Sequence, residues 1–113
     1  ERISGIDFLK ENPRFIEPNL SRNIEASNAF RKLASEFSIS ASGLAIAWLL
    51  HQGENIIPIP GTRSVDHLKE LAEGAQRDLS IDELRLIEDA LPVGWAHGNR
   101  YSVGQTVAVE QYC

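Results

Sequence analysis

The feature that most constrains this fold is one short run of apolar residues, IIPI at residues 56–59, set between stretches of helical pattern. The run is continuous rather than alternating, which is typical of a strand buried on both faces of a parallel sheet. Pro58 has no N–H to donate to a ladder, so we expect the strand to stop near it. One strand cannot make a parallel sheet alone. We therefore expect its partner strands to come from another chain or from further sequence of the same protein.

A tight turn and a helix start follow this run directly. Residues 60–63 read PGTR, and Ser64 stands at the N-cap position of an amphipathic pattern over residues 65–73. A helix start offers unpaired backbone N–H groups and the positive end of the helix dipole, and Arg63 adds a full charge beside them. We interpret this stretch as a binding site for a phosphate or a dinucleotide.

Two helices are predicted before this stretch. Apolar side chains recur at spacings of three and four over residues 20–37, as on one face of a helix. Ser40 is a suitable N-cap for a second helix over residues 41–52, and Gly53 is expected to end it in a left-handed conformation. The second helix is apolar almost all round. It should therefore be buried on more than one side.

The remaining chain contains one more predicted helix. Ser80 and Glu83 have the spacing of a capping box, which predicts a helix over residues 81–91. The prolines of the first 20 residues exclude a continuous helix there, so we expect an irregular arm. Residues 93–113 show little periodicity and are predicted to be a partly ordered loop.

Composition limits the class of protein. With 113 residues the chain is one domain at most, and its net charge of −5 leaves no overall basic field for nucleic acid or an anionic membrane surface. It has one cysteine and no apolar stretch long enough to span a membrane, so we expect a cytoplasmic protein without an intrachain disulfide. The chain opens on Glu1 and contains no methionine. Together with the single strand, this predicts the C-terminal piece of a larger α/β protein.

Four stretches carry a resemblance to a known family: NPRF at residues 12–15, AIAWLL at 45–50, IPIPGTR at 57–63 and VDHLKE at 65–70. They resemble the C-terminal third of an aldo-keto reductase of the bacterial type, over nearly the whole chain. That family is a (β/α)8 (TIM) barrel that reduces aldehydes and ketones with NADPH, so the resemblance implies an α/β fold that is mostly helical within this segment. The run at residues 56–59 would then be the eighth barrel strand, with the turn at its C-terminal end, where barrel active sites lie.

The resemblance also implies a cofactor site. By position, Gly61, Thr62 and Arg63 would lie against the adenosine-side phosphate of NADPH. Thr62 would donate a hydroxyl hydrogen bond and Arg63 a charged one. Arg63 favours a 2′-phosphate, and therefore NADP over NAD.

The same resemblance extends into the helix after the turn. His67 lies near the position of a basic residue in the family, and Glu70 matches the first member of a Glu-Asn pair that holds the adenine. Leu71 replaces the asparagine of that pair and offers no side-chain hydrogen bond. One adenine contact is therefore lost or comes from another residue.

Catalytic residues are not predicted in this chain. The family uses an Asp, a Tyr, a Lys and a His from earlier barrel strands, and none of these motifs is matched here. Tyr101 follows Arg100, but a tyrosine that packs in a C-terminal loop is the simpler interpretation. We expect the chain alone to be inactive, with the rest of the barrel as its partner and a small carbonyl compound as the substrate of the whole enzyme.

Other sites are weakly supported. His51, His67 and His97 are 16 and 30 residues apart, which does not match a metal site, and Cys113 has no flanking base. Two alternatives remain open. The first alternative is an independent helical binding module that dimerises through residues 41–52. The second is part of a barrel enzyme that binds a phosphorylated ligand other than a dinucleotide.

Overall fold

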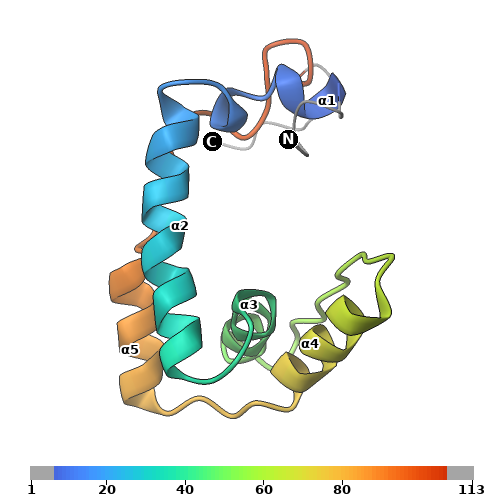
Figure 1. The fold of residues 1–113 in the computed structure, drawn as a ribbon, viewed down its shortest axis with the longest axis vertical. Helices are drawn as coiled ribbons and strands as arrows, with labels where there is room; N and C mark the ends of the chain where they lie inside the picture. Colours follow the sequence, from blue (N-terminus) through green and yellow to red (C-terminus); the bar gives the residue numbers. More distant parts are fainter. Residues whose placement is uncertain (1–6, 107–113) are drawn as a thin grey trace. The chain divides into compact units, whose positions relative to one another are not determined.

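The computed structural model describes residues 7–106, and the side chains of residues 9–106, in two compact units (Figure 1). The first unit comprises Glu1–Ala26 and Gly94–Cys113, and the second comprises Ser27–Val93. The boundary between them falls within helix α2 (Asn19–Glu36). The candidate site lies entirely in the second unit.

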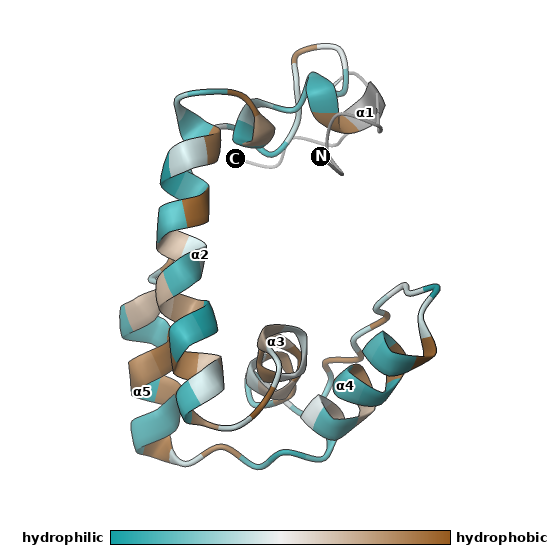
Figure 2. Ribbon diagram, in the orientation of Figure 1, coloured by the Kyte–Doolittle hydropathy of each residue, from teal (hydrophilic) through white to brown (hydrophobic). Residues whose placement is uncertain are grey.

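The second unit is built around helix α3 (Ala41–Leu50), with α4 (Val65–Ala75), α5 (Ile81–Ala90) and the C-terminal half of α2. Helix α3 buries four residues of its first seven, which confirms that this apolar helix is covered on more than one side. Hydrophilic and hydrophobic residues alternate along α5 (Figure 2), and its apolar face joins α2 and α3 in one core. The buried core residues are Leu33, Ala34, Leu44, Ala47, Leu79 and Ile87.

Three serines begin helices as predicted. Ser40, Ser64 and Ser80 occupy the N-cap positions of α3, α4 and α5. Each hydroxyl oxygen accepts a hydrogen bond from the backbone N–H three residues later, at 3.0, 3.4 and 3.2 Å respectively. The carboxylate of Glu83 accepts the N–H of Ser80 at 2.8 Å, which completes the capping box.

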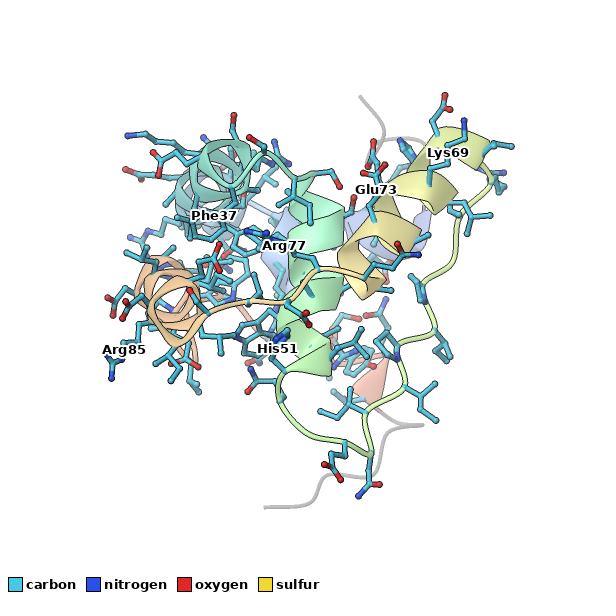
Figure 3. The ribbon with its side chains drawn as sticks, turned by 90° about the horizontal axis from the view of Figure 1, so that it is seen from below. Phe37, His51, Lys69, Glu73, Arg77 and Arg85 are labelled. Atoms are coloured by element: carbon cyan, nitrogen blue, oxygen red, sulfur yellow. The ribbon has the colours of Figure 1, made fainter. Side chains whose placement is uncertain are left out.

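The end of α3 differs from the prediction. The helix stops at Leu50, and its C-cap is His51 with φ −83°, whereas Gly53 does not adopt a positive φ. The Nε2 atom of His51 accepts the N–H of Leu79 at 3.1 Å, so Nδ1 carries the proton that is donated to the carbonyl of Ala47 at 2.8 Å. Figure 3 shows His51 beside the segment that joins α4 to α5. The imidazole thus does what the glycine was expected to do, by satisfying a carbonyl of the last turn.

The strand predicted at residues 56–59 is not formed within the described part of the chain. No strand is assigned among residues 7–106, and residues 56–60 have no regular structure. The side chains of Ile57 and Ile59 are 83% and 92% exposed. A strand needs a neighbour to accept and donate its ladder hydrogen bonds, and the described chain supplies none to this segment.

No single helix in the described part of the chain is long and apolar enough to cross a membrane. Helices α2 and α3 together reach the required length and composition, but a bend of 87° separates them.

The first unit joins the N-terminal arm to the loop that follows residue 94. The arm contains α1 (Asp7–Lys10) and a 3-10 helix (Pro13–Phe15), so it is irregular as predicted except for the short α1. Asn12 is 6% exposed, and its Nδ2 donates to the carbonyl of Arg100 at 2.6 Å. Asn23 donates to the carbonyl of His97 at 2.9 Å and accepts its N–H at 2.8 Å. These amides hold the loop, which contains no α-helix or strand over residues 93–106.

Candidate functional site

Helices α3 and α4 approach each other closely, because two glycines face each other at the contact. A Cβ added to Gly74 would overlap the carbonyl oxygen of Gly43 and lie 2.5 Å from its Cα. A Cβ added to Gly43 would lie 2.8 Å from the carbonyl oxygen of Glu70. Since each of these neighbours is backbone, no side-chain movement would make room. The glycine pair therefore sets the position of α4 relative to α3.

A cleft of about 260 Å³ lies beside this contact, where the segment after Pro58 turns into α4. Its wall combines residues of the turn, the first two turns of α4 and the start of α3. The lining residues are Ser42, Pro60, Gly61, Thr62, His67, Glu70 and Leu71.

The turn that leads into α4 is held by side-chain hydrogen bonds to backbone. The hydroxyl oxygen of Thr62 accepts the N–H of Ser64 at 3.1 Å, and the Thr62 hydroxyl lies 3.4 Å from the Ser64 carbonyl oxygen. Ser64 in turn caps the N–H of His67. The N–H groups of Val65 and Asp66 lie in the first turn of the helix, where no intrahelical acceptor exists. This end of α4 therefore presents hydrogen-bond donors next to the cleft.

Two of the lining residues form a hydrogen bond between two helices. The hydroxyl of Ser42 on α3 donates to Oε2 of Glu70 on α4 at 2.9 Å. Glu70 is half-buried, and Leu71 beside it presents an apolar surface. The cleft thus has a donor-rich end at the turn and an end with one carboxylate and one leucine.

The structure brings together four of the five residues predicted to hold a cofactor. Gly61, Thr62, His67 and Glu70 all line the cleft, whereas Arg63 is exposed and is not among the lining residues. Arg63 directly follows Thr62, which lines the cleft. The flexible arginine side chain can therefore contact a ligand that extends out of the cleft.

Three lining residues were not predicted as site residues: Ser42, Pro60 and Leu71. Ser42 was treated only as part of an apolar helix. The signal that was available is the pair Ser42-Gly43 in the first turn of the helix, since small residues on an apolar helix indicate a close approach of another backbone.

Charge around the cleft is mixed rather than strongly basic. Glu70 lines it, and Asp66 in the first turn of α4 pairs with Lys69 at 3.6 Å on the surface. Arg63 directly precedes the N-cap of α4, and His67 lies in the first turn of that helix. The N–H donors and Arg63 suit an anionic group, whereas Glu70 and Leu71 suit a group that has a hydrogen-bond donor and an apolar surface.

Other residues considered from sequence lie elsewhere. Tyr101 is half-buried in the first unit, with the Arg100 guanidinium 5.6 Å from its ring centroid. Trp48 packs against the core of the second unit. Within the described residues, no group of three or more His, Cys, Asp or Glu side chains is placed to hold a metal ion. Cys113 lies outside the described residues.

Comparison with known proteins gives a consistent result. The sequence model of the Aldo/keto reductase family matches residues 4–92. The chain is 38% identical over 104 residues to "Probable aldo-keto reductase 1" of Glycine max, a match that covers 92% of this chain and 30% of that protein. It is 35% identical over 98 residues to "Aldo-keto reductase yakc (NADP(+))" of Schizosaccharomyces pombe, covering 87% of this chain and 29% of the yeast protein. The chain therefore spans less than a third of the length of these relatives. No solved structure matches it significantly.

Proposed function

Because this chain belongs to the aldo/keto reductase family, a family of oxidoreductases with a TIM-barrel fold, we propose that it is the C-terminal, cofactor-binding part of an NADPH-dependent reductase of aldehydes and ketones. The observation that carries the proposal is the cleft at the start of α4, which Gly61, Thr62, His67 and Glu70 line together. The yeast relative, at 35% identity, is named for NADP(+), which supports the choice of cofactor.

Each end of the cleft fits one part of the cofactor. Thr62, the free N–H groups of the first turn of α4 and Arg63 are donors that suit a phosphate on the adenosine ribose. Arg63 prefers NADPH because only NADPH has a 2′-phosphate for the guanidinium to bind. At the other end, Glu70 accepts a hydrogen bond from the adenine, and Leu71 packs against the ring.

Gly61 supports a ligand role because packing does not require it. Its φ is not positive, and an added Cβ would meet no atom within 4 Å. Neither backbone conformation nor packing therefore requires a glycine at this position. Without a side chain, Gly61 leaves open space at the cleft wall, which a bound phosphate can approach.

The chemistry of the reaction belongs to the rest of the protein. NADPH supplies a hydride when bound, and the residues of this chain bind and orient the adenosine end of the cofactor. None of the described side chains takes the role of the proton donor. The exposed side chains of Ile57 and Ile59 suit burial against neighbouring strands and helices of a complete barrel, in which residues 56–59 form the eighth strand.

Titration of the natural full-length protein with NADPH and with NADH tests this function. We expect both to bind, NADPH more tightly, by isothermal titration calorimetry. A protein that binds neither, but dimerises through α3, would support an independent helical module. Binding of inorganic phosphate or a sugar phosphate without nicotinamide cofactor would support a different barrel enzyme.

A further inference from the structure

We propose that Ser42 is a positioning residue, which holds Glu70 so that the site selects the 6-amino group of adenine. The inference rests on the proposed function and extends it to a residue on α3. Ser42 is not a cofactor residue in our sequence-based assignment, and it acts through Glu70 rather than on the reacting atoms.

The hydrogen-bond directions around Ser42 follow from the atoms present. A carboxylate only accepts, so the Ser42 hydroxyl must donate to Glu70 Oε2. The hydroxyls of Ser42 and Ser40 are 3.1 Å apart. Since the proton of Ser42 is already directed to Glu70, Ser40 is the donor in that contact. The Ser40 oxygen also accepts the N–H of Gly43 at 3.0 Å. A chain of hydrogen bonds therefore runs from the α3 N-cap to Glu70, and each bond polarises the next.

The backbone of Glu70 is fixed at the same place. Its carbonyl oxygen faces Gly43, where even a methyl group would lie at 2.8 Å. Glu70 is thus held against α3 at its backbone by the glycine contact and at its carboxylate by Ser42. The start of α3 works as a support for one side chain of the cleft.

Leu71 makes the position of this carboxylate decisive. Glu70 is the one carboxylate among the residues that line the cleft, and its neighbour Leu71 has no hydrogen-bonding group. Adenine carries a 6-amino donor, whereas hypoxanthine carries a 6-oxo acceptor that a carboxylate repels. Discrimination between the two rings then depends on where the Glu70 carboxylate is held, and so on Ser42.

The test compares NADPH with its reduced hypoxanthine analogue in the natural full-length protein. We expect Ser42→Ala to weaken NADPH about three- to tenfold, as the loss of one hydrogen bond to a partly exposed charged group implies. Binding of the hypoxanthine analogue should change less than about twofold, since the analogue does not use the carboxylate as an acceptor. Ser42→Thr keeps the hydroxyl and should retain the selectivity. Ser35→Ala, on the exposed face of α2, is the matched control.

Two results would overturn the inference. One is equal weakening of both ligands by Ser42→Ala, which indicates general damage to the cleft. The other is that Ser42→Ala changes neither affinity. A second experiment combines Ser42→Ala with Glu70→Gln. We expect the double variant to have the same ratio of NADPH affinity to analogue affinity as Glu70→Gln alone. If Ser42→Ala changes this ratio as much in the Glu70→Gln background as in the natural protein, Ser42 does not act through Glu70. If the unmodified protein binds neither ligand, the proposed function itself fails, and this outcome is distinct from both.

Discussion

The contact between α3 and α4 and the turn into α4 both depend on glycine, but for opposite reasons. At the helix contact, Gly43 and Gly74 are buried, and any added carbon would collide with backbone. At the turn, Gly61 is exposed and has open space around it. Gly43 and Gly74 therefore build the cleft, whereas Gly61 leaves room inside it. Stability and cofactor binding should therefore respond to different substitutions.

The largest expected effect on stability is at the helix contact. In the natural full-length protein, Gly74→Ala should lower the free energy of unfolding by about 2 kcal/mol, because overpacking outweighs the gain in helix propensity. The measurement is a denaturant titration. Gly53→Ala is the matched control, since an added Cβ there meets nothing within 4 Å. Equal midpoints for the two variants would show that α3 and α4 do not need this approach.

The opposite pattern is expected at the turn. Gly61→Ala should leave the unfolding midpoint unchanged or slightly raised, because its backbone conformation is open to alanine. The added methyl group should weaken NADPH roughly tenfold by occupying the cleft wall, a cost of about 1.4 kcal/mol. Calorimetry of the variant measures this directly. An alanine variant that binds NADPH normally would remove Gly61 from the site.

A smaller effect is expected at the start of α5, away from both regions. The hydrogen bond from the Ser80 N–H holds the pKa of the Glu83 carboxyl below its ordinary value of 4.5, with help from the Ser80 hydroxyl and from Arg77. A lowered pKa in the folded state means that Glu83 stabilises the fold above its unfolded pKa and loses that contribution as pH falls through the folded pKa.

Comparison of the protein with its Glu83→Gln variant tests this pH dependence. Glutamine keeps a capping side chain without the titrating charge. The difference in unfolding free energy should be constant from neutral pH to about pH 5.5 and shrink below pH 4.5, with a size of about 0.5–1 kcal/mol. A difference that grows on acidification would contradict the assigned sign. NADPH affinity at neutral pH should be the same in both proteins.

Much of the local structure could be predicted because it depends on neighbours in sequence. The N-cap serines and the capping box follow from residues three positions apart, and the burial of α3 follows from its almost entirely apolar sequence. The structure confirms all of these predictions. The local sequence could not show whether residues 56–59 form a strand, because a strand exists only with a partner strand. The prediction of a left-handed Gly53 was wrong because the His51 ring caps the helix instead. The ring is held by the backbone N–H of Leu79, which is 28 residues away in the sequence.

The candidate site was predicted in part for the same reason. Gly61, Thr62 and His67 lie within one turn and helix start, so a local motif places them together. Ser42 was not predicted because it joins the cleft through the packing of α3 on α4, which depends on Gly43 and Gly74. Gly43 indicates that another backbone comes close to α3, but the local sequence does not identify α4 as that partner.

The most direct test of the central claim is the ratio of NADPH to NADH affinity in Arg63→Ala of the natural full-length protein. A charged hydrogen bond to a phosphate contributes about 1.5–3 kcal/mol, so NADPH binding should weaken about ten- to a hundredfold while NADH binding changes little. Arg31→Ala, which removes an exposed charge from α2, should alter neither affinity. Equal weakening of both cofactors by Arg63→Ala would contradict a 2′-phosphate site at the start of α4.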